Sequence, residues 1–417
     1  MSTPTVSDLF RVFGRIGIFS FGGPAAQIAV MHRELVEERP WLTEKQFLGA
    51  LSFTMLLPGP EAMQLATWSG WKLGGTRIGL MAGLLFVLPG ALVIAALALA
   101  YVAWGDVPQV AAAFDGIQAL VVVIVVQALL KLRKKALHRG ADVAIAVAAF
   151  AAIFLFDTPF PLIILAAAVI GALIGPASPP EPAPARAPVP LSATLGTVAI
   201  WVVLWMLPLA AVWLAGNAFL TEMALFFAKL AVVTFGGAYA VLGYMTQAVV
   251  DTHGWLTPDE MIDALGLAET TPGPLILVTQ FTAMVAGAKA GGTGLALIAG
   301  ALTLWMTFVP CFLWIFAFAP HLERLLAAPR LAGALSAITA AVTGVIADLS
   351  VWFAMHVVFA SVDDSRTPPR PDWASIDPGA IGLIALGAVL LWGLRLGLLT
   401  ALPLMALAGL GLHAAAG

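Results

Sequence analysis

Two Pro-Gly-Pro tripeptides, Pro58-Gly59-Pro60 and Pro272-Gly273-Pro274, stand inside long apolar stretches of this sequence. Proline lacks a backbone N–H and breaks a helix. Within a membrane such a break is tolerated only where the freed polar groups are buried in protein or face a water-filled cavity. A helix that restarts after the break offers unpaired N–H groups and a positive dipole end, which suit an anion. We therefore predict an anion site here, with plain helix kinks as the alternative.

A second motif, Phe-Gly-Gly, also occurs twice, at Phe21-Gly22-Gly23 and at Phe235-Gly236-Gly237. Glycine lets a ligand or another backbone approach closely. Tight contact between helices through small residues is the alternative. Because both motifs are duplicated, we favour a substrate-lining role for Gly22, Gly23, Gly236 and Gly237.

Polar residues that suit a negatively charged substrate lie near these motifs. Arg15 and Lys229 each precede a Phe-Gly-Gly motif by six residues inside an apolar segment. Cations at such positions fit an anion, although long basic side chains also extend to the membrane surface. Gln64, Thr271 and Gln280 lie close to the Pro-Gly-Pro breaks and could donate hydrogen bonds to an oxyanion.

Three isolated acids are candidates for proton coupling. Glu61 directly follows Pro60, Glu269 precedes Pro272 by three residues, and Asp348 lies in an apolar run. Burial would favour their protonated forms, but Glu61 and Glu269 could instead cap helix ends. The mixed-charge run 33–39 is expected to be a solvated surface segment, with Arg33 as a gate to the site as the alternative.

The two copies of each motif are separated by the same number of residues, which indicates an internal repeat. The second Phe-Gly-Gly, Trp-Leu-Thr and Pro-Gly-Pro each follow the first by 214 positions. Later matches, such as Pro89 with Pro310, are 221 positions apart, and we expect the seven extra residues around the glycine pairs 74–75 and 291–292. The sequence thus predicts two copies of one unit, at 5–176 and 219–413, as in many transporters.

The amino-acid composition indicates whether water or lipid surrounds these copies. The 417 residues are 61% hydrophobic and 10% charged, with a mean hydropathy of +0.99. Soluble domains carry about 25% charged residues. Apolar runs recur at a length of roughly 17–25 residues, which spans a bilayer as a helix. We predict an all-α polytopic membrane protein embedded in the lipid bilayer, with about 10–13 transmembrane segments.

Composition and spacing also argue against several classes of protein. A single cysteine, Cys311, allows no intrachain disulfide, and the six histidines show no metal-binding spacing. The sequence has no basic domain that would bind nucleic acid. We therefore expect no metal, no cofactor and no nucleic-acid partner, and a protein that is a monomer or a homodimer.

The candidate spans number thirteen, and two of them are expected to be broken or re-entrant because Pro-Gly-Pro interrupts them. They are 8–31, 46–71, 77–104, 109–131, 141–156, 160–175, 192–214, 219–246, 260–287, 292–319, 331–359, 379–394 and 396–413.

Charge in the loops predicts how the copies are oriented. Lys and Arg concentrate at 131–139, which we place in the cytoplasm, whereas the corresponding segment 360–377 is acidic and is placed outside. The loop that contains Asp106 and its counterpart, which contains Arg324 and Arg330, also carry opposite charge, in agreement with this assignment. The copies are therefore expected to be inverted, with the N-terminus cytoplasmic in the inner membrane.

The connection between the copies fits this arrangement. A proline-rich segment, 177–191, is expected to be a cytoplasmic linker. An additional transmembrane helix at 192–214 would then invert the second copy.

At these motifs the sequence resembles the chromate ion transporter (CHR) family in its long, two-domain form. The resemblance rests on FSFGGPAAQIAVMHRELVEERPWLTEKQF, LPGPEAMQLATWSGWKLGG and FVLPG, and on VTFGGAYAVL, HGWLTPDEM and TTPGPLILVTQF. It implies an efflux carrier for chromate, a dianion isosteric with sulfate, driven by the proton gradient or by sulfate exchange. The family's paired signatures fall on Phe21–Pro24, Pro58–Glu61, Phe235–Gly237 and Pro272–Pro274. Ala238 stands where the first copy has Pro24, so the half-sites need not be equal.

Three other functions remain open from the sequence. A carrier of sulfate or another oxyanion would use the same features. A channel would conduct without saturation. A membrane-embedded enzyme would need a metal-ligand or nucleophile cluster at one membrane face, and the sequence shows no such grouping, so we expect a transporter and not an enzyme.

Overall fold

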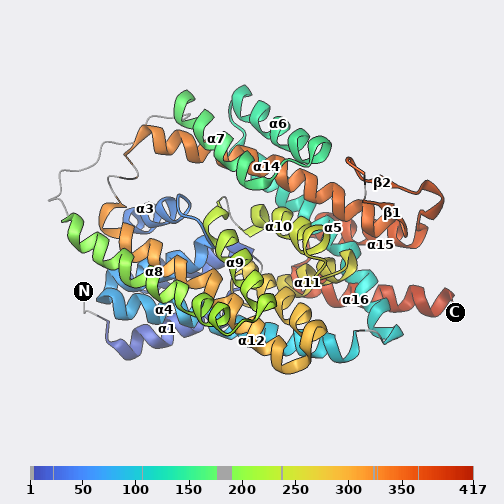
Figure 1. Cartoon of the computed structure of the whole chain (residues 1–417), viewed down its shortest axis with the longest axis horizontal. Coiled ribbons are helices and arrows are strands. Elements are labelled where there is room, and N and C mark those ends of the chain that lie inside the picture. The colour runs from blue at the N-terminus through green and yellow to red at the C-terminus, as the bar shows by residue number, and fades with distance from the viewer. Residues whose placement is uncertain are drawn as a thin grey trace. The chain divides into compact units, whose positions relative to one another are not determined.

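The fold comes from a computed structural model that describes residues 4–21, 23–105, 107–175, 190–235, 238–322, 325, 327–364 and 366–416. The described chain is almost entirely helical, with one short hairpin of strands β1 (Val362–Asp363) and β2 (Arg370–Pro371) (Figure 1). The prediction of an all-α polytopic fold is confirmed. The proline-rich linker and the loop residues Asp106 and Arg324 lie outside the described residues, apart from the linker's last two positions, 190 and 191.

The chain forms two compact units, and each draws on both halves of the sequence. Unit 1 contains Met1–Leu99, Pro179–Ala238 and Thr271–Ala332, and unit 2 contains Ala100–Ser178, Tyr239–Thr270 and Gly333–Gly417. Compact units and sequence copies therefore do not coincide.

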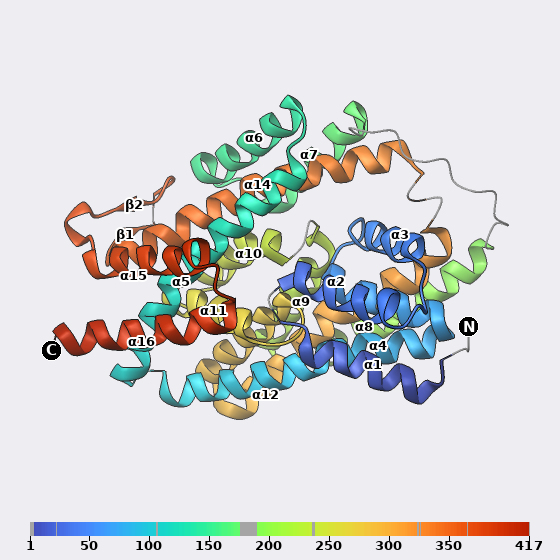
Figure 2. The ribbon, with the colours of Figure 1, turned by 180° about the vertical axis from the view of Figure 1, so that it is seen from behind.

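Unit 1 holds the segments that carry the duplicated motifs. Its elements are α1 (Val6–Phe19), α2 (Gly23–His32), the π-helix η1 (Arg33–Glu37), α3 (Glu44–Thr54), most of α4 (Glu61–Trp104), α8 (Leu191–Leu214), α9 (Ala218–Val233), the 3-10 turn η3 (Leu275–Leu277), α12 (Val278–Phe318) and η4 (Ala319–His321). Within it α1 packs on α2, and α12 packs on both α8 and α9 (Figure 2).

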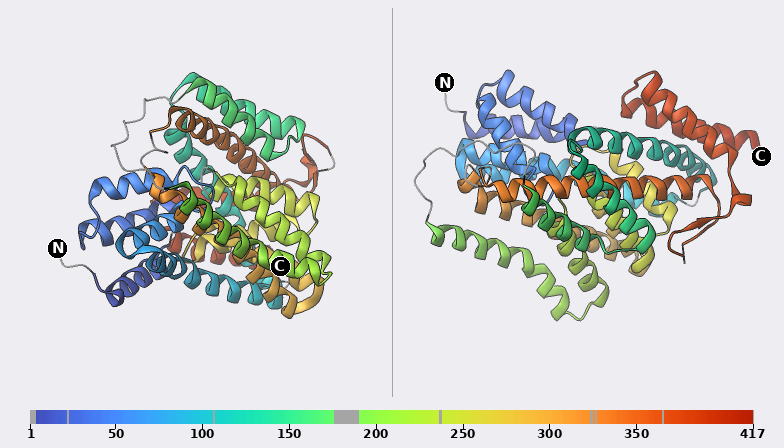
Figure 3. Two further views of the ribbon diagram at one scale, coloured as in Figure 1. Left: turned by 60° about the vertical axis from the view of Figure 1, so that its left-hand side comes forward. Right: turned by 90° about the horizontal axis from the view of Figure 1, so that it is seen from above.

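Unit 2 holds the remaining helices and the hairpin. Its elements are α5 (Pro108–Ala136), α6 (Gly140–Phe156), α7 (Phe160–Ile174), α10 (Ala238–Gln247), the π-helix η2 (Ala248–Thr252), α11 (Pro258–Thr270), most of α14 (Pro329–Val358), β1, β2, η5 (Trp373–Ser375), α15 (Pro378–Ala388), η6 (Val389–Gly393) and α16 (Leu398–Ala416). Helices α6 and α7 lie side by side (Figure 3), and α5 packs against α11, α15 and α16.

The repeated Trp-Leu-Thr motif is a helix start. Thr43 caps α3 through its hydroxyl, which accepts from the Gln46 N–H, while the Gln46 side chain accepts from the Thr43 N–H. Thr257 and Glu260 make the same reciprocal pair at the start of α11. Such a capping box satisfies two donors that a helix start leaves unpaired.

Two of the expected single spans, 8–31 and 219–246, are each a pair of helices, which corrects the sequence prediction. The chain leaves α1 at Ser20 and α9 at Thr234, and the next helices begin at Gly23 and Ala238. The Ser20 and Thr234 hydroxyls donate back to the carbonyls of Ile16 and Leu230. Gly23 has φ +79°, a left-handed conformation that interrupts a helix and that glycine adopts at low cost.

The long helices α4 and α12 both bend at a glycine pair. Gly74 and Gly75 have φ −156° and +75°, and Gly291 and Gly292 have φ −167° and +77°. The pairs are 217 positions apart, so three of the seven extra residues precede the bend. The turn η3, which has no counterpart after Pro60, supplies them, and the other four lie between the bend and the helix proline. The seven extra residues, which we expected around the glycine pairs, are thus divided between the two sides of the bend.

Six described helical segments are long and apolar enough to cross a membrane. They are Glu61–Trp104, Pro108–Ala136, Leu191–Leu214, Leu275–His321, Pro329–Val358 and Leu398–Ala415. Three shorter apolar segments, Gly140–Phe156, Phe160–Ile174 and Pro378–Gly393, accompany them. The chain is thus a multi-pass membrane protein, and helix length alone supports fewer full crossings than thirteen.

Candidate functional site

The two Pro-Gly-Pro loops each bind the break of the opposite sequence half, inside unit 1. The Gly59 N–H donates to the Thr234 carbonyl at 2.8 Å, and the Gly273 N–H donates to the Ser20 carbonyl at 2.9 Å. Both glycines have positive φ, +117° and +86°. In this conformation their N–H groups point away from their own helices, towards the opposite sequence half. The four helix breaks of the two halves are therefore joined by a matched pair of hydrogen bonds.

Each loop also packs against the residue that follows the helix proline of the other half. A Cβ on Gly90, next to Pro89, would stand 2.1 Å from the Pro272 carbonyl oxygen. A Cβ on Gly59 would stand 2.8 Å from the sulfur of Cys311, which follows Pro310. In both cases the Pro-Gly-Pro loop of one sequence half thus contacts the long helix of the other half.

Three buried glutamines hold the backbone of this region. Gln64 donates through Nε2 to the Pro58 carbonyl at 2.6 Å, and Gln280 donates to the Ala91 carbonyl at 3.0 Å. Gln27, which the sequence reasoning missed, donates to the Gly273 carbonyl at 2.6 Å. Each glutamine is at most 4% exposed, and each Oε1 has no hydrogen-bond partner. The amides of Gln64 and Gln280 thus donate to backbone carbonyls, and their contact with a substrate stays a prediction.

Further polar groups in α4 and α12 are buried without a partner. They are Trp68 Nε1, Ser69 Oγ, Thr282 Oγ1, Thr303 Oγ1, Thr307 Oγ1 and Trp314 Nε1. Leaving such a group unsatisfied costs about 1–3 kcal/mol. Water or a polar ligand in the interior of unit 1 would remove this cost.

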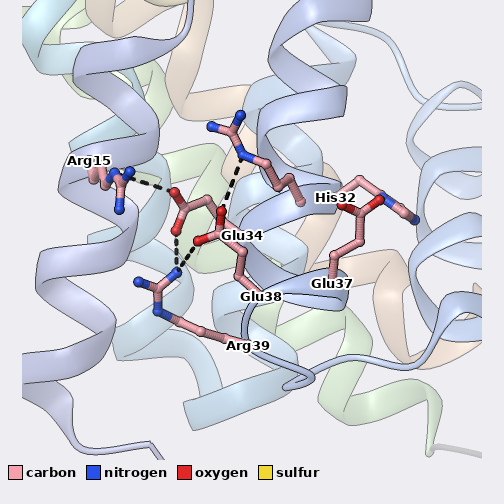
Figure 4. A network of polar contacts seen from close by, with 7 residues as sticks. Arg15, His32, Glu34, Glu37, Glu38 and Arg39 are labelled. Carbon is pink, nitrogen blue, oxygen red and sulfur yellow. Dashed lines mark hydrogen bonds and ion pairs between the residues drawn. The ribbon is translucent and has the colours of Figure 1, made fainter.

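Arg15 lies in an ion-pair network that joins α1 to η1 (Figure 4). Its Nε is 3.3 Å from Glu34 Oε1, and Arg39 binds the other oxygen of the same carboxylate. Glu34 is 1% exposed, whereas half of the Arg15 side chain is exposed. The expectation of a wholly solvated segment 33–39 was wrong at Glu34, because η1 turns this carboxylate towards α1.

The other predicted site residues divide between buried and exposed positions. Lys229 is exposed on α9, Glu61 is half-buried in the first turn of α4, and Thr271 is buried beside Pro272. Gly22, Gly236 and Gly237 lie outside the described residues.

The predicted acid Glu269 lies in unit 2 with a second acid that the sequence reasoning missed. Glu269 accepts a hydrogen bond from the Tyr239 hydroxyl and is 4% exposed. Asp263, on the same helix α11, is 5% exposed and accepts from Tyr101 and Gln118. The signal available for Asp263 was an acid within the apolar run that begins at Met261, inside the predicted span 260–287.

The third predicted acid, Asp348, lines a cavity of about 280 Å³ in unit 2. Asp157, Asp251 and Asp364 line the same cavity, together with Arg366. Arg366 is paired with Asp363 at 2.9 Å, so it offers the cavity little compensation. This cavity repels anions, whereas the breaks of unit 1 present N–H and O–H donors, so an oxyanion fits the unit 1 region.

Comparison with known proteins agrees with these features. The sequence model of the family described as "Chromate transporter" matches residues 7–172 and 221–412. No solved structure matches the chain.

Three curated relatives cover most of the chain. A chromate transport protein of Pseudomonas aeruginosa is 33% identical over 368 residues, covering 87% of this chain and 82% of that protein. A chromate transport protein of Cupriavidus metallidurans is 30% identical, covering 82% and 81%. A probable chromate transport protein of Synechococcus elongatus is also 30% identical, covering 82% and 83%. The chain belongs to the chromate transporter family, and this membership implies a transporter.

Proposed function

We propose that this chain is a secondary active transporter that carries chromate out of the cell across the inner membrane. The observation that carries the proposal is the reciprocal pair of hydrogen bonds, Gly59 to Thr234 and Gly273 to Ser20, which gathers four helix breaks in one unit. Broken helices of this kind form substrate sites in transporters.

The chemistry of unit 1 supports an oxyanion as the substrate. Helix starts present N–H groups to an anion, and buried hydroxyl and indole donors without partners lie on the two long helices that follow the breaks. We assign substrate contact to the Pro-Gly-Pro and Phe-Gly-Gly segments with Gln64, Thr271 and Gln280. Arg15 and Lys229 would supply positive charge near the route to the site.

Relatives named for chromate transport support chromate as the particular oxyanion. Sulfate has the same charge and shape, so exchange with sulfate and coupling to protons both fit. A potential that is negative inside assists export, because moving a dianion outward gains about 4.6 kcal/mol per 100 mV.

We further propose that residues 5–176 and 219–413 are inverted copies, joined by the linker 177–191 and the helix near 192–214. The matching caps, breaks and glycine bends of the two halves support common ancestry. Inverted copies would let one site open alternately to either side.

Uptake of labelled chromate into everted vesicles tests the function. We expect saturable uptake that a pH gradient or internal sulfate stimulates, and that external sulfate reduces in proportion to its affinity. Arg15→Ala and Lys229→Ala should each reduce uptake about 10- to 100-fold, the effect of losing a hydrogen bond to a charged group.

The matched control is Arg11→Ala, one turn before Arg15 on the same helix, which should leave uptake unchanged. Vesicles that take up no more chromate than empty-vector vesicles would refute chromate transport. Uptake of sulfate that chromate does not inhibit would instead identify a sulfate carrier.

A further inference from the structure

Helix α11 is buried on all sides and yet carries two carboxylates. Every residue from Met261 to Glu269 is buried, including Asp263 and Glu269. An ionised carboxylate in such surroundings is expensive unless a cation or several donors compensate it.

Asp263 has neutral partners only. Its Oδ2 accepts from the Tyr101 hydroxyl at 2.7 Å, and its Oδ1 accepts from Gln118 Nε2 at 2.9 Å. No Lys or Arg of the described residues pairs with it, and the charges that act on it are those of Asp259 on α11 and Asp115 on α5.

This arrangement accommodates both the charged and the protonated acid. A tyrosine hydroxyl both donates and accepts, so it can reverse its hydrogen bond when the carboxyl gains a proton, while the Gln118 amide donates in either state. The rings of Phe114 and Tyr101 pack edge to face with their centroids 5.3 Å apart, which helps to hold the Tyr101 hydroxyl in place.

The position of Asp263 along the chain suits coupling to the substrate region. One turn before it, Asp259 is exposed and provides contact with water. After it, α11 ends at Thr270 and the chain enters Thr271 and the second Pro-Gly-Pro loop, whose Gly273 binds Ser20. Asp263 therefore lies on the helix that leads directly, along the chain, into this loop.

Two of the acids that the sequence singled out, Glu269 and Asp348, suit this role less well. Glu269 has the basic residue Lys131 acting on it, so part of its charge is compensated by a cation. Asp348 lies in an open cavity shared with three other aspartates.

We propose that Asp263 binds the proton that is exchanged for the oxyanion, with Tyr101 and Gln118 as positioning residues. This rests on the proposed transport of chromate. On the side to which protons are supplied, the Asp263 carboxylate takes up one proton, and it releases that proton on the other side in each cycle.

The test compares two modes of transport by the full-length protein in proteoliposomes. Accumulation of labelled chromate driven by a pH gradient needs proton movement, whereas exchange of labelled for unlabelled chromate does not. Asp263→Asn should lower accumulation at least tenfold and leave exchange within about twofold of the original protein. Asp115→Asn, which removes a neighbouring charge on α5, should retain both activities.

Tyr101→Phe adds a readout that a purely structural role would not change. Loss of this donor destabilises the carboxylate, so the midpoint of the pH profile of accumulation should move to higher pH. Glutamate at the same position, Asp263→Glu, should restore part of the accumulation.

The outcomes separate the two proposals. If the original protein exchanges chromate but a pH gradient drives no accumulation, or if Asp263→Asn loses or keeps both modes together, the role of Asp263 is refuted and chromate transport stands. If the original protein exchanges no chromate, the proposed function itself fails.

Discussion

Four acids of unit 2 line one cavity, together with a single arginine. Asp251 is one of them, and partial burial together with the nearby Asp364 raises the pKa of this carboxyl to about 6. The sequence singled out Asp348 because it stands alone in an apolar run. It could not single out Asp251 or Asp157, because only the packing of α14 with the ends of α6 and α10 brings these separate segments together.

Asp251→Asn should stabilise the protein at neutral pH and not in acid. The folded-state pKa is above the unfolded value of 3.8, so the native state loses stability as the pH rises from about 4 to 6. Asparagine removes this loss, and its advantage in melting temperature in detergent should grow over that range and then stay constant. The neighbouring Thr252→Ala should show a pH-independent difference, and an equal effect of Asp251→Asn at pH 4 and pH 8 would contradict the assignment.

The repeated motifs act at the level of elements, because each is a place where a helix begins, ends or bends. Helices α1 and α9 end just before the Phe-Gly-Gly motifs, α3 and α11 end before Pro-Gly-Pro, Trp-Leu-Thr caps α3 and α11, and the glycine pairs bend the two longest helices. The breaks at Pro-Gly-Pro were predictable from proline chemistry. The hydrogen bonding of each loop to the opposite half could not be predicted, because the spacing of motifs along the sequence does not show which half supplies the partner.

Gly90→Ala should disrupt this crossed contact between loop and helix. The new methyl group would stand 2.1 Å from the Pro272 backbone oxygen, and overpacking of this kind costs about 1–3 kcal/mol. We expect a lower melting temperature and lower chromate uptake. Gly14→Ala, which would have nothing within 4 Å, should be neutral or slightly stabilising in its helix. Equal melting temperatures for the two variants would contradict the close contact.

On the scale of the whole molecule, the positions of the charged segments within unit 2 can be compared with the predicted membrane topology. The basic segment ends at Arg139, which donates to the Gly175 carbonyl at 3.2 Å, and Gly175 contacts Gly333 near the start of α14. The segment 360–377, which carries four aspartates and two arginines, follows the other end of this helix, which has 30 residues and is about 45 Å long. The basic and the acidic segment therefore lie at opposite ends of a helix of membrane-spanning length, an arrangement that is compatible with the predicted topology.

Cysteine labelling tests this topology in cells. In a Cys311→Ser background, Asp372→Cys should react with an impermeant maleimide in spheroplasts, and Lys134→Cys should react only after permeabilisation. The buried native Cys311 alone should give no signal. Labelling of both positions from the outside would contradict the inverted arrangement.

The lipid environment, the helical class, the duplicated motifs and the family resemblance could all be predicted from the amino-acid sequence. Each depends on local properties, namely apolar run length, the missing proline N–H and the spacing of short motifs. Which groups meet could be seen only in the folded chain. It paired Gly59 with Thr234 and Gly273 with Ser20, buried Glu34 between two arginines, and enclosed Asp263 between two neutral donors. These contacts join residues far apart in the chain, and burial and partner choice depend on packing that no short stretch of sequence encodes.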